Sequence, residues 1–302
     1  MRVHTIDLRF QGLPGVIAAY LVEGPAGAVL VETGPGSTLP ALWAGLAERG
    51  LRPADVRHVF VTHIHLDHAG AAGWWARDGA MVYVHRVGAA HLVDPSRLLA
   101  SAQRIYADRM EALWGDVLPA PQERVTALDD GDVLELAGLR FAAIDTPGHA
   151  RHHMVYGVGD VAFTGDAAGV RLPGLDLVDL PAPPPEFDRE AWLATLDRLE
   201  ALAPAAIYPT HFGRLDRVRE QLNGLRALLG EASGLVRGMM VMGAERDDML
   251  REYRAWGMAR MRCAGAPDGA VRPYDLANPF EMSVDGIARY WRKQGLGEPG
   301  TT

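Results

Sequence analysis

The residues of this chain that are best suited to metal binding or catalysis are three histidines and an aspartate in the segment HIHLDH, residues 63–68. They follow the apolar run VFV, which is typical of a buried strand. Alternate residues at the end of an extended strand point the same way, so His63 and His65 can hold one metal ion. Asp67 and His68 can face a second ion as the chain turns into a helix. Imidazole and carboxylate ligands together favour zinc, iron or manganese over calcium or magnesium. A histidine-rich surface turn is the alternative, and a position at the end of a buried strand argues against it.

The segment THIHLDH resembles the HxHxDH signature of the metallo-β-lactamase superfamily, and three later motifs resemble the other metal ligands of that family, in the family's order. They are TPGHA, FTGDA and YPTHFG, which contain His149, Asp166 and His211. The resemblance covers roughly residues 15 to 213. It implies a first ion on His63, His65 and His149, a second on Asp67, His68 and His211, and Asp166 as the bridge between them. The implied cofactors are two divalent metal ions, with zinc preferred and iron or manganese as alternatives.

Two positions beside these motifs modify the resemblance. The family usually has an aspartate in an early D-T-G motif, where this chain has Glu32 in VETG. A glutamate can still accept a hydrogen bond beside the ligands. His153 resembles a histidine often found four residues after the TPGH ligand, and we interpret it as a supporting or core-filling residue. The remaining histidines lie outside the ligand positions, and we interpret them as structural: His4, His58, His85, His91 and His152.

The implied reaction is hydrolysis without a covalent protein nucleophile. Two divalent ions about 3.5–4 Å apart lower the pKa of a shared water towards neutrality, which makes a metal-bridging hydroxide available. Asp166 as the bridge and Asp67 as a carboxylate able to move a proton are the implied catalytic residues. The full ligand set resembles the glyoxalase II, lactonase and phosphodiesterase branches of the family. The glutathione-binding residues of glyoxalase II have no match here, so the resemblance does not imply that specificity. We expect a small ester, thioester or lactone as substrate.

Two other reactions fit the same signature. Some members of the family hold one iron and oxidise persulfides with a subset such as His63, His149 and Asp166. Phosphodiester hydrolysis is the second, since the ligand set alone cannot choose between carbon and phosphorus electrophiles. The apolar segment Gly169–Pro185 follows Asp166 directly, so we expect it to form a wall of the substrate pocket. Arg171 in this segment is either a ligand for a substrate carboxylate or phosphate or an ordinary solvated arginine.

The elements that must position these residues alternate along the first 215 residues. Strand patterns occur in VHTIDL, GVIAAYLV, AVLVETG, VRHVFVTH, RVTAL, DVLEL, LRFAAID, MVYGVG, VAFTGD and AIYPTH. Helical patterns cover residues 37–49, 94–114 and 190–202. Apolar residues form a stripe along 94–114, and we interpret this stripe as packing on the core rather than forming a lid or a dimer face. Two clusters of strands favour two packed sheets over one doubly wound sheet. The expected fold is α/β, an αββα sandwich of two mixed β-sheets with helices on the outer faces.

Helical patterns dominate the rest of the chain, over residues 215–230, 247–262 and 282–294. We therefore expect a metal-binding catalytic domain over residues 1–215 and a helical C-terminal section over residues 216–302 packed on it.

The composition predicts a globular protein that acts on a small molecule. Hydrophobic residues make up 48% and charged residues 23% of the chain, which are ordinary values. The formal net charge of −8 disfavours nucleic acid as a partner. No run of about 18 apolar residues predicts a membrane span. Cys263 is the single cysteine, and the N-terminal residues lack a signal-peptide pattern, so we expect the cytoplasm. A homodimer is compatible with the sequence.

Overall fold

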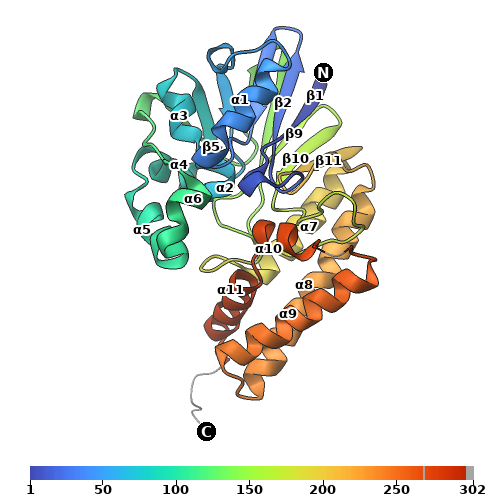
Figure 1. Cartoon of the computed structure of the whole chain (residues 1–302). Helices are drawn as coiled ribbons and strands as arrows, with labels where there is room; N and C mark the ends of the chain where they lie inside the picture. The colour runs from blue at the N-terminus through green and yellow to red at the C-terminus, as the bar shows by residue number, and fades with distance from the viewer. Residues whose placement is uncertain (268, 297–302) are drawn as a thin grey trace.

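A computed structural model of the chain describes residues 1–267 and 269–296, and it places two β-sheets face to face (Figure 1). The first sheet has the strand order β1 (Arg2–Asp7), β2 (Ala18–Gly24), β3 (Gly27–Val31), β4 (His58–Phe60), β5 (Met81–His85) and β6 (Val125–Leu128). The second has the order β11 (Ala206–Pro209), β10 (Val161–Gly165), β9 (Met154–Val158), β8 (Leu139–Asp145) and β7 (Val133–Leu136). Strands β3 to β6 run parallel, as do β10 and β11, while the other pairs are antiparallel. Both sheets are therefore mixed, as the sequence predicted.

Large aromatic side chains fill the space between the two sheets. Phe60 of β4 is fully buried and stacks on Phe141 of β8, with ring centroids 4.8 Å apart. Tyr20, Tyr156 and Phe163 belong to the same buried cluster. A strand that packs on this core on one face and on helices on the other can carry apolar residues at every position. This double burial explains the continuous apolar run that precedes the HIHLDH segment.

Helices cover the outer face of each sheet. Helices α1 (Leu39–Ala47), α3 (Ala72–Arg77) and α4 (Arg86–Val93) pack on the first sheet. Helix α7 (Arg189–Leu202) packs on the second sheet through its buried residues Trp192 and Leu196. The order helix, sheet, sheet, helix is the αββα sandwich that the sequence predicted.

The helix predicted over residues 94–114 is divided. Helix α5 (Ser96–Tyr106) and helix α6 (Met110–Trp114) are separated by a turn at Ala107, whose φ is 48° and ψ is −117°. A non-glycine residue in this conformation ends the α-helical hydrogen-bond ladder. Trp114 is buried, as a core-facing stripe requires, but Ile105 is 42% exposed. The prediction of one continuous helix was wrong, although part of its apolar stripe does face the core.

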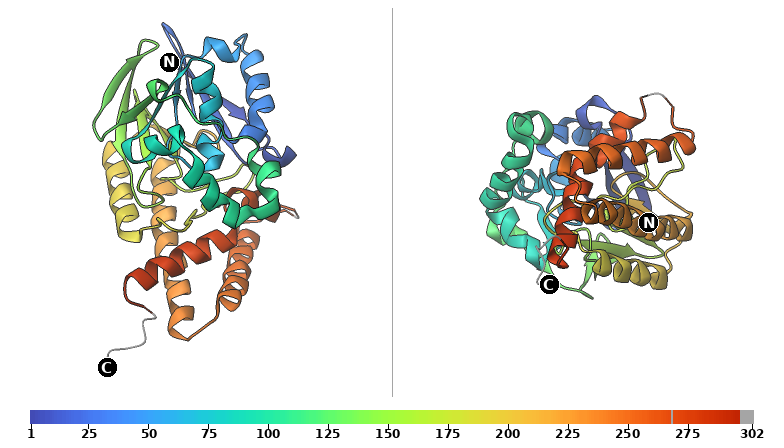
Figure 2. Two further views of the ribbon diagram at one scale, coloured as in Figure 1. Left: turned by 90° about the vertical axis from the view of Figure 1, so that its left-hand side faces the viewer. Right: turned by 90° about the horizontal axis from the view of Figure 1, so that it is seen from below.

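Four helices form the C-terminal part of the described chain: α8 (Val218–Val241), α9 (Arg246–Cys263), α10 (Val271–Ala277) and α11 (Phe280–Lys293). Figure 2 shows α8 and α9 running side by side, with α11 packed across both. Leu225 of α8 and Ile287 of α11 share a buried cluster with Trp192 of α7 and with side chains of the second sheet. Among the described residues, no helix has the length and apolar content needed to cross a membrane.

Candidate metal centre

All of the predicted ligands lie on loops or on a short helix at one edge of the two sheets. Each of these segments follows a strand, so the sheets fix where the segment begins. His63 and His65 follow β4, Asp67 and His68 lie on α2 (Leu66–Ala69), His149 lies between β8 and β9, Asp166 follows β10 directly, and His211 follows β11. Residues up to 148 positions apart in sequence, 63 and 211, thus come together at one edge.

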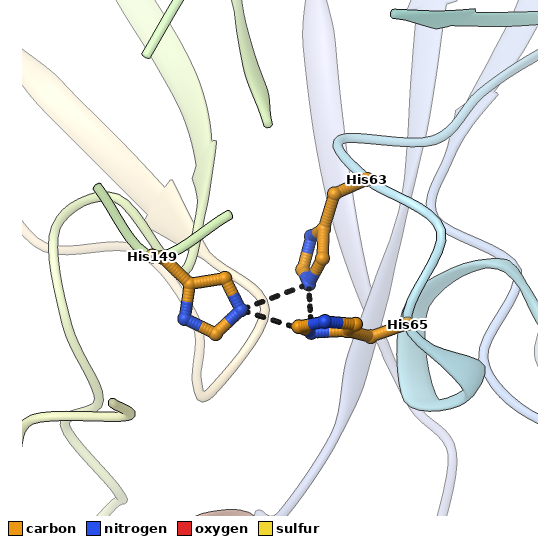
Figure 3. Close-up of side chains that lie close together, drawn as sticks. All are labelled: His63, His65 and His149. Atoms are coloured by element: carbon orange, nitrogen blue, oxygen red, sulfur yellow. Dashed lines mark hydrogen bonds between the residues drawn. The ribbon is translucent and has the colours of Figure 1, made fainter. Parts of the chain in front are cut away.

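His63, His65 and His149 form one compact group (Figure 3). The distances between their facing ring nitrogens are 2.9 Å for His63 Nε2 to His65 Nδ1, 3.0 Å for His149 Nε2 to His65 Nδ1, and 3.2 Å for His149 Nε2 to His63 Nε2. Tetrahedral zinc with nitrogen ligands at 2.0–2.1 Å would separate the nitrogens by about 3.3 Å. The group therefore has the size of one face of such a site.

Asp67, His68 and His211 form a second group. Asp67 Oδ2 lies 3.6 Å from His68 Nε2 and 3.3 Å from His211 Nε2. Asp166 lies between the two groups and presents a different oxygen to each. Its Oδ2 is 3.3 Å from His149 Nε2, whereas its Oδ1 is 3.5 Å from His68 Nε2. This is the arrangement expected of a carboxylate that bridges two ions.

Unsatisfied buried atoms test whether this donor set fits metal ions. His68 Nε2, His211 Nε2 and Asp166 Oδ1 are buried without a hydrogen-bond partner. Leaving a buried polar atom unpaired costs about 1–3 kcal/mol, so each such atom calls for an explanation. Two of these atoms belong to the second group, and Asp166 Oδ1 lies 3.5 Å from His68 Nε2 and 3.7 Å from His211 Nε2. Imidazole nitrogens and carboxylate oxygens are donors that zinc, iron and manganese accept. The donor set therefore fits metal binding.

The outward-facing ring nitrogens are held by hydrogen bonds that orient the imidazoles. His149 Nδ1 donates to the carbonyl oxygen of Pro181 at 2.8 Å, and His211 Nδ1 donates to that of Val16 at 2.8 Å. His63 Nδ1 lies 3.1 Å from Thr62 Oγ1. Such bonds fix the tautomer and direct the free nitrogen towards a metal. The rings of the candidate centre are thus preorganised by the chain itself.

Glu32 is fully buried at the centre of a hydrogen-bond network beneath the ligands. Its Oε1 accepts from His68 Nδ1 at 3.0 Å, from Thr210 Oγ1 at 3.0 Å, and from the hydroxyl of Thr62. Its Oε2 accepts from the backbone N–H of Thr62 at 3.2 Å. The backbone of Glu32 has a φ of 68°, an uncommon conformation for a residue with a side chain. The glutamate therefore fills the hydrogen-bonding role that its sequence position suggested.

His153 and His152 support the centre in different ways. His153 Nε2 accepts from the backbone N–H of Asp166 at 3.1 Å, which agrees with the predicted supporting role. His152, which no sequence motif singles out, is buried and stacks on His63 with ring centroids 5.9 Å apart. Its Nε2 lies 3.3 Å from a carboxylate oxygen of Glu186. The sequence holds no local signal for this pair, because 34 positions separate its members.

The electrostatics of the two groups differ. Burial lowers the pKa of His65 to about 3, and burial also holds the pKa of His63 well below its usual range. Burial alone would lower the pKa of His68 too, but the carboxylates of Asp67, Asp166 and Glu32 raise it well above its usual range. The first group therefore offers neutral imidazoles, the form that binds metals, whereas the second group is rich in negative charge and attracts cations.

The segment Gly169–Pro185 contributes both to the core and to a cavity beside the candidate centre. Leu180 is buried in a core cluster, whereas Leu172 and Leu175, although largely buried, line a surface cavity with Phe212, the residue after His211. The side chain of Arg171 is largely buried, pairs with Asp176 and donates to Gln221 Oε1 at 3.1 Å. Its charge is thus already engaged within the protein.

Three of the other histidines interpreted as structural make local contacts outside the two ligand groups. His4 Nε2 lies 2.8 Å from Glu23 Oε2, and His58 Nδ1 lies 3.0 Å from the hydroxyl of Tyr83. His85 Nδ1 accepts from the backbone N–H of Val87 at the start of α4. These contacts agree with a structural role.

Comparison with known proteins gives a consistent result. The sequence profile described as the metallo-beta-lactamase superfamily matches residues 12–211. The metallo-beta-lactamase fold-containing protein ST1585 of Sulfurisphaera tokodaii is 27% identical over 215 residues, which cover 70% of this chain and 78% of that protein. The atrochrysone carboxyl ACP thioesterase of Aspergillus fumigatus is 25% identical over 196 residues, 64% of this chain, and this chain spans 36% of that protein's length.

Among solved structures, the metallo-beta-lactamase family protein TTHA1429 from Thermus thermophilus superposes with a TM-score of 0.72. The match covers 97% of this chain and 94% of that one at 23% sequence identity. At this identity the likeness concerns the fold, and it extends over the C-terminal helices as well as the sheets.

Proposed function

Because this chain belongs to the metallo-β-lactamase superfamily, we propose that it is a binuclear metal-dependent hydrolase that cleaves a small ester, thioester or lactone. The observation that carries the proposal is the presence of two donor groups with Asp166 between them. Asp166 faces His149 of the first group with one oxygen and His68 of the second group with the other. Most members of this family are metal-dependent hydrolases.

In this proposal, His63, His65 and His149 would hold one ion, Asp67, His68 and His211 would hold the other, and Asp166 would be available to both. Two divalent ions, with zinc preferred, would supply Lewis acidity for the scissile bond and lower the pKa of water towards neutrality. The imidazoles of His68 and His211 hold the pKa of Asp67 at about 2 against the effect of burial, so its carboxylate is ionised at neutral pH. Asp67 is also the more exposed of the two aspartates, with 21% of its side chain accessible. Its accessibility makes it the carboxylate that substrate and solvent can reach, and we propose that it moves a proton during the reaction.

A thioester is the favoured substrate class. The similarity to a protein named as a carboxyl ACP thioesterase supports it, since that similarity covers 64% of this chain. The net charge of −8 argues against a polyanionic substrate such as RNA or DNA. A thioester carries no charge at its reacting carbonyl carbon, and its hydrolysis needs no co-substrate other than water.

Metal content and substrate range test the proposal together. Purified protein is assayed for bound metals by mass spectrometry and then with an acyl thioester, a lactone, an aryl ester and a phosphodiester, before and after chelation. We expect two divalent ions per chain, hydrolysis of the thioester, and loss of this activity on chelation with recovery on adding zinc. Faster cleavage of the phosphodiester than of any ester would overturn the substrate class. One iron per chain with oxygen uptake on a persulfide would overturn the hydrolase proposal.

A further inference from the structure

A second feature with ligand-binding chemistry lies on α11, outside the candidate metal centre. It is a surface cavity of about 460 Å³, within the range of pockets that take small molecules. Its lining residues are Pro184, Asp285, Arg289, Arg292 and Lys293. The spacing of the helical members, positions 285, 289, 292 and 293, places them on one face of α11. We call this cavity the α11 pocket.

The α11 pocket is positively charged. Arg289 and Arg292 are exposed and form no ion pair with any residue within 1–267 or 269–296. Lys293 Nζ donates to the carbonyl oxygen of Pro185 at 3.0 Å, a contact that leaves its charge uncompensated. The carboxylate of Asp285 is engaged by Arg246, with nitrogen–oxygen distances of 2.7 Å. In a chain of net charge −8, this concentration of cations favours an anionic ligand.

A structural explanation for these cations accounts for only part of the arrangement. Cations in the last turn of a helix are stabilised by the helix dipole, and this effect covers Arg292 and Lys293. Arg289 lies about one turn earlier, where the effect fades. The dipole also gives no reason for the cavity that the cations share with Pro184.

The α11 pocket is joined to the metal centre by one short backbone segment. The carbonyl oxygen of Pro181 accepts from His149 Nδ1 at 2.8 Å, and Pro184 lines the pocket. Between them, Ala182 packs so closely on Gly286 of α11 that a Cβ at Gly286 would lie 1.9 Å from the Ala182 carbonyl oxygen. Three residues of chain span at most about 10 Å, so Pro184 at the edge of the pocket lies within about that distance of the carbonyl oxygen that accepts from His149.

We propose that the α11 pocket binds the phosphate groups of a thioester substrate whose thiol half ends in a nucleotide, as coenzyme A does, while the thioester group reaches the metal centre. The inference rests on the proposed function. Arginine guanidinium groups match phosphate oxygens with paired hydrogen bonds, and two of them on one helix face suit a diphosphate or two separate phosphates. In the reaction, water adds to the thioester carbon and the carbon–sulfur bond breaks. The products are the carboxylate, one proton and the free thiol.

Steady-state kinetics with two substrates test this assignment. Acetyl-coenzyme A carries the phosphates, and acetyl-pantetheine has the same thioester without them. In the variant R289A/R292A we expect the KM for acetyl-coenzyme A to rise about tenfold with kcat unchanged, and the KM for acetyl-pantetheine to stay as it was. The matched control is Arg262→Ala, which removes an exposed arginine from the last turn of α9 and should alter neither KM.

Calorimetric titration of the metal-loaded protein with coenzyme A separates this inference from the proposed function. Binding that weakens in R289A/R292A and with added salt, but not in Arg262→Ala, supports the pocket even if no ester is hydrolysed. An absence of esterase activity on every substrate would overturn the proposed function alone. Thioester hydrolysis with equal KM values for the two substrates, together with no binding of coenzyme A, would overturn the pocket alone.

Discussion

Replacing Glu32 with glutamine tests how the buried carboxylate controls the second group of ligands. In the native chain the charged Oε1 accepts from His68 Nδ1, and Oε2 accepts from the N–H of Thr62. Glutamine has the same size but carries one oxygen and one amino group. If its oxygen stays towards His68, its amino group faces the N–H of Thr62, and two donors oppose each other. The substitution therefore weakens the three hydrogen bonds that Oε1 accepts, including the one from His68, and leaves the N–H of Thr62 unpaired.

The magnitude follows from these contacts. A hydrogen bond to a charged acceptor contributes about 1.5–3 kcal/mol and one to a neutral acceptor about 0.5–1.5 kcal/mol, so the bond that orients His68 loses about 1–1.5 kcal/mol. Loss of such an orienting partner typically weakens metal binding by about 10–100-fold. We expect this factor for the ion held by Asp67, His68 and His211. The first group should change less, because Glu32 reaches His63 only through the hydroxyl of Thr62.

The assay is a competition titration of metal-free protein with a chromophoric chelator, which resolves the two dissociation constants for zinc. Glu23→Gln is the matched control, because Glu23 also accepts from a histidine, His4 at 2.8 Å, but lies away from the centre. The control should bind both ions as the native chain does. Two unchanged dissociation constants in the Glu32→Gln variant would refute the reasoning that Glu32 orients a metal ligand.

Three further changes have defined outcomes. Asp166→Ala should lose the second ion and most hydrolytic activity, because one side chain faces both groups; metal counting by mass spectrometry that still found two tightly bound ions would exclude the bridge. Leu225→Ala should lower the free energy of unfolding by about 2–5 kcal/mol in urea titration, because this side chain is fully buried between α8 and its neighbours, and a loss below about 1 kcal/mol would contradict that packing. Burial raises the pKa of Asp179 above its ordinary value of 3.8, so its contribution to stability is present below that value and is lost as the pH rises through the folded-state pKa. Asp179→Asn should therefore gain stability relative to the native chain as the pH rises above 3.8, and a difference that stays constant with pH would count against a raised pKa.

The parts of the centre that the sequence predicted are those with local signatures. His63, His65 and His68 occur within six positions at the end of a buried strand, so their proximity follows from strand geometry and from one helical turn. The partnership of His152 with Glu186 could not be predicted in this way, because it depends on how the proline-rich loop packs against the loop after β8. Contacts of this kind arise from tertiary packing, and a single sequence does not say which distant segments pack together.

The fold shows the same division between local and tertiary causes. Strand β5 (Met81–His85) was not predicted from the sequence. Helix α8 continues to Val241, beyond the end predicted at Gly230. Glycine usually weakens a helix, but the buried stripe of α8 goes on through Ala232 and Val236, and this packing outweighs the cost of about 1 kcal/mol. At Ala107 a helix ends where the sequence predicts that it continues, because α5 stops there although no glycine or proline is present. The surroundings, not the residue, set that boundary.

The segment from Leu180 to Ala182 is held from two sides at once. The carbonyl oxygen of Leu180 accepts from Asn278 Nδ2 at 2.9 Å and from Ser283 Oγ at 3.0 Å, while the next carbonyl, that of Pro181, holds His149. The same stretch of backbone therefore holds α11 in place and orients the imidazole ring of His149. By thermodynamic linkage, two events that stabilise the same conformation strengthen each other by an equal factor. Metal binding at the proposed centre would therefore be coupled to the C-terminal helices: a change that detaches α11 would weaken metal binding, and bound metal would stabilise the docked helix by the same free energy.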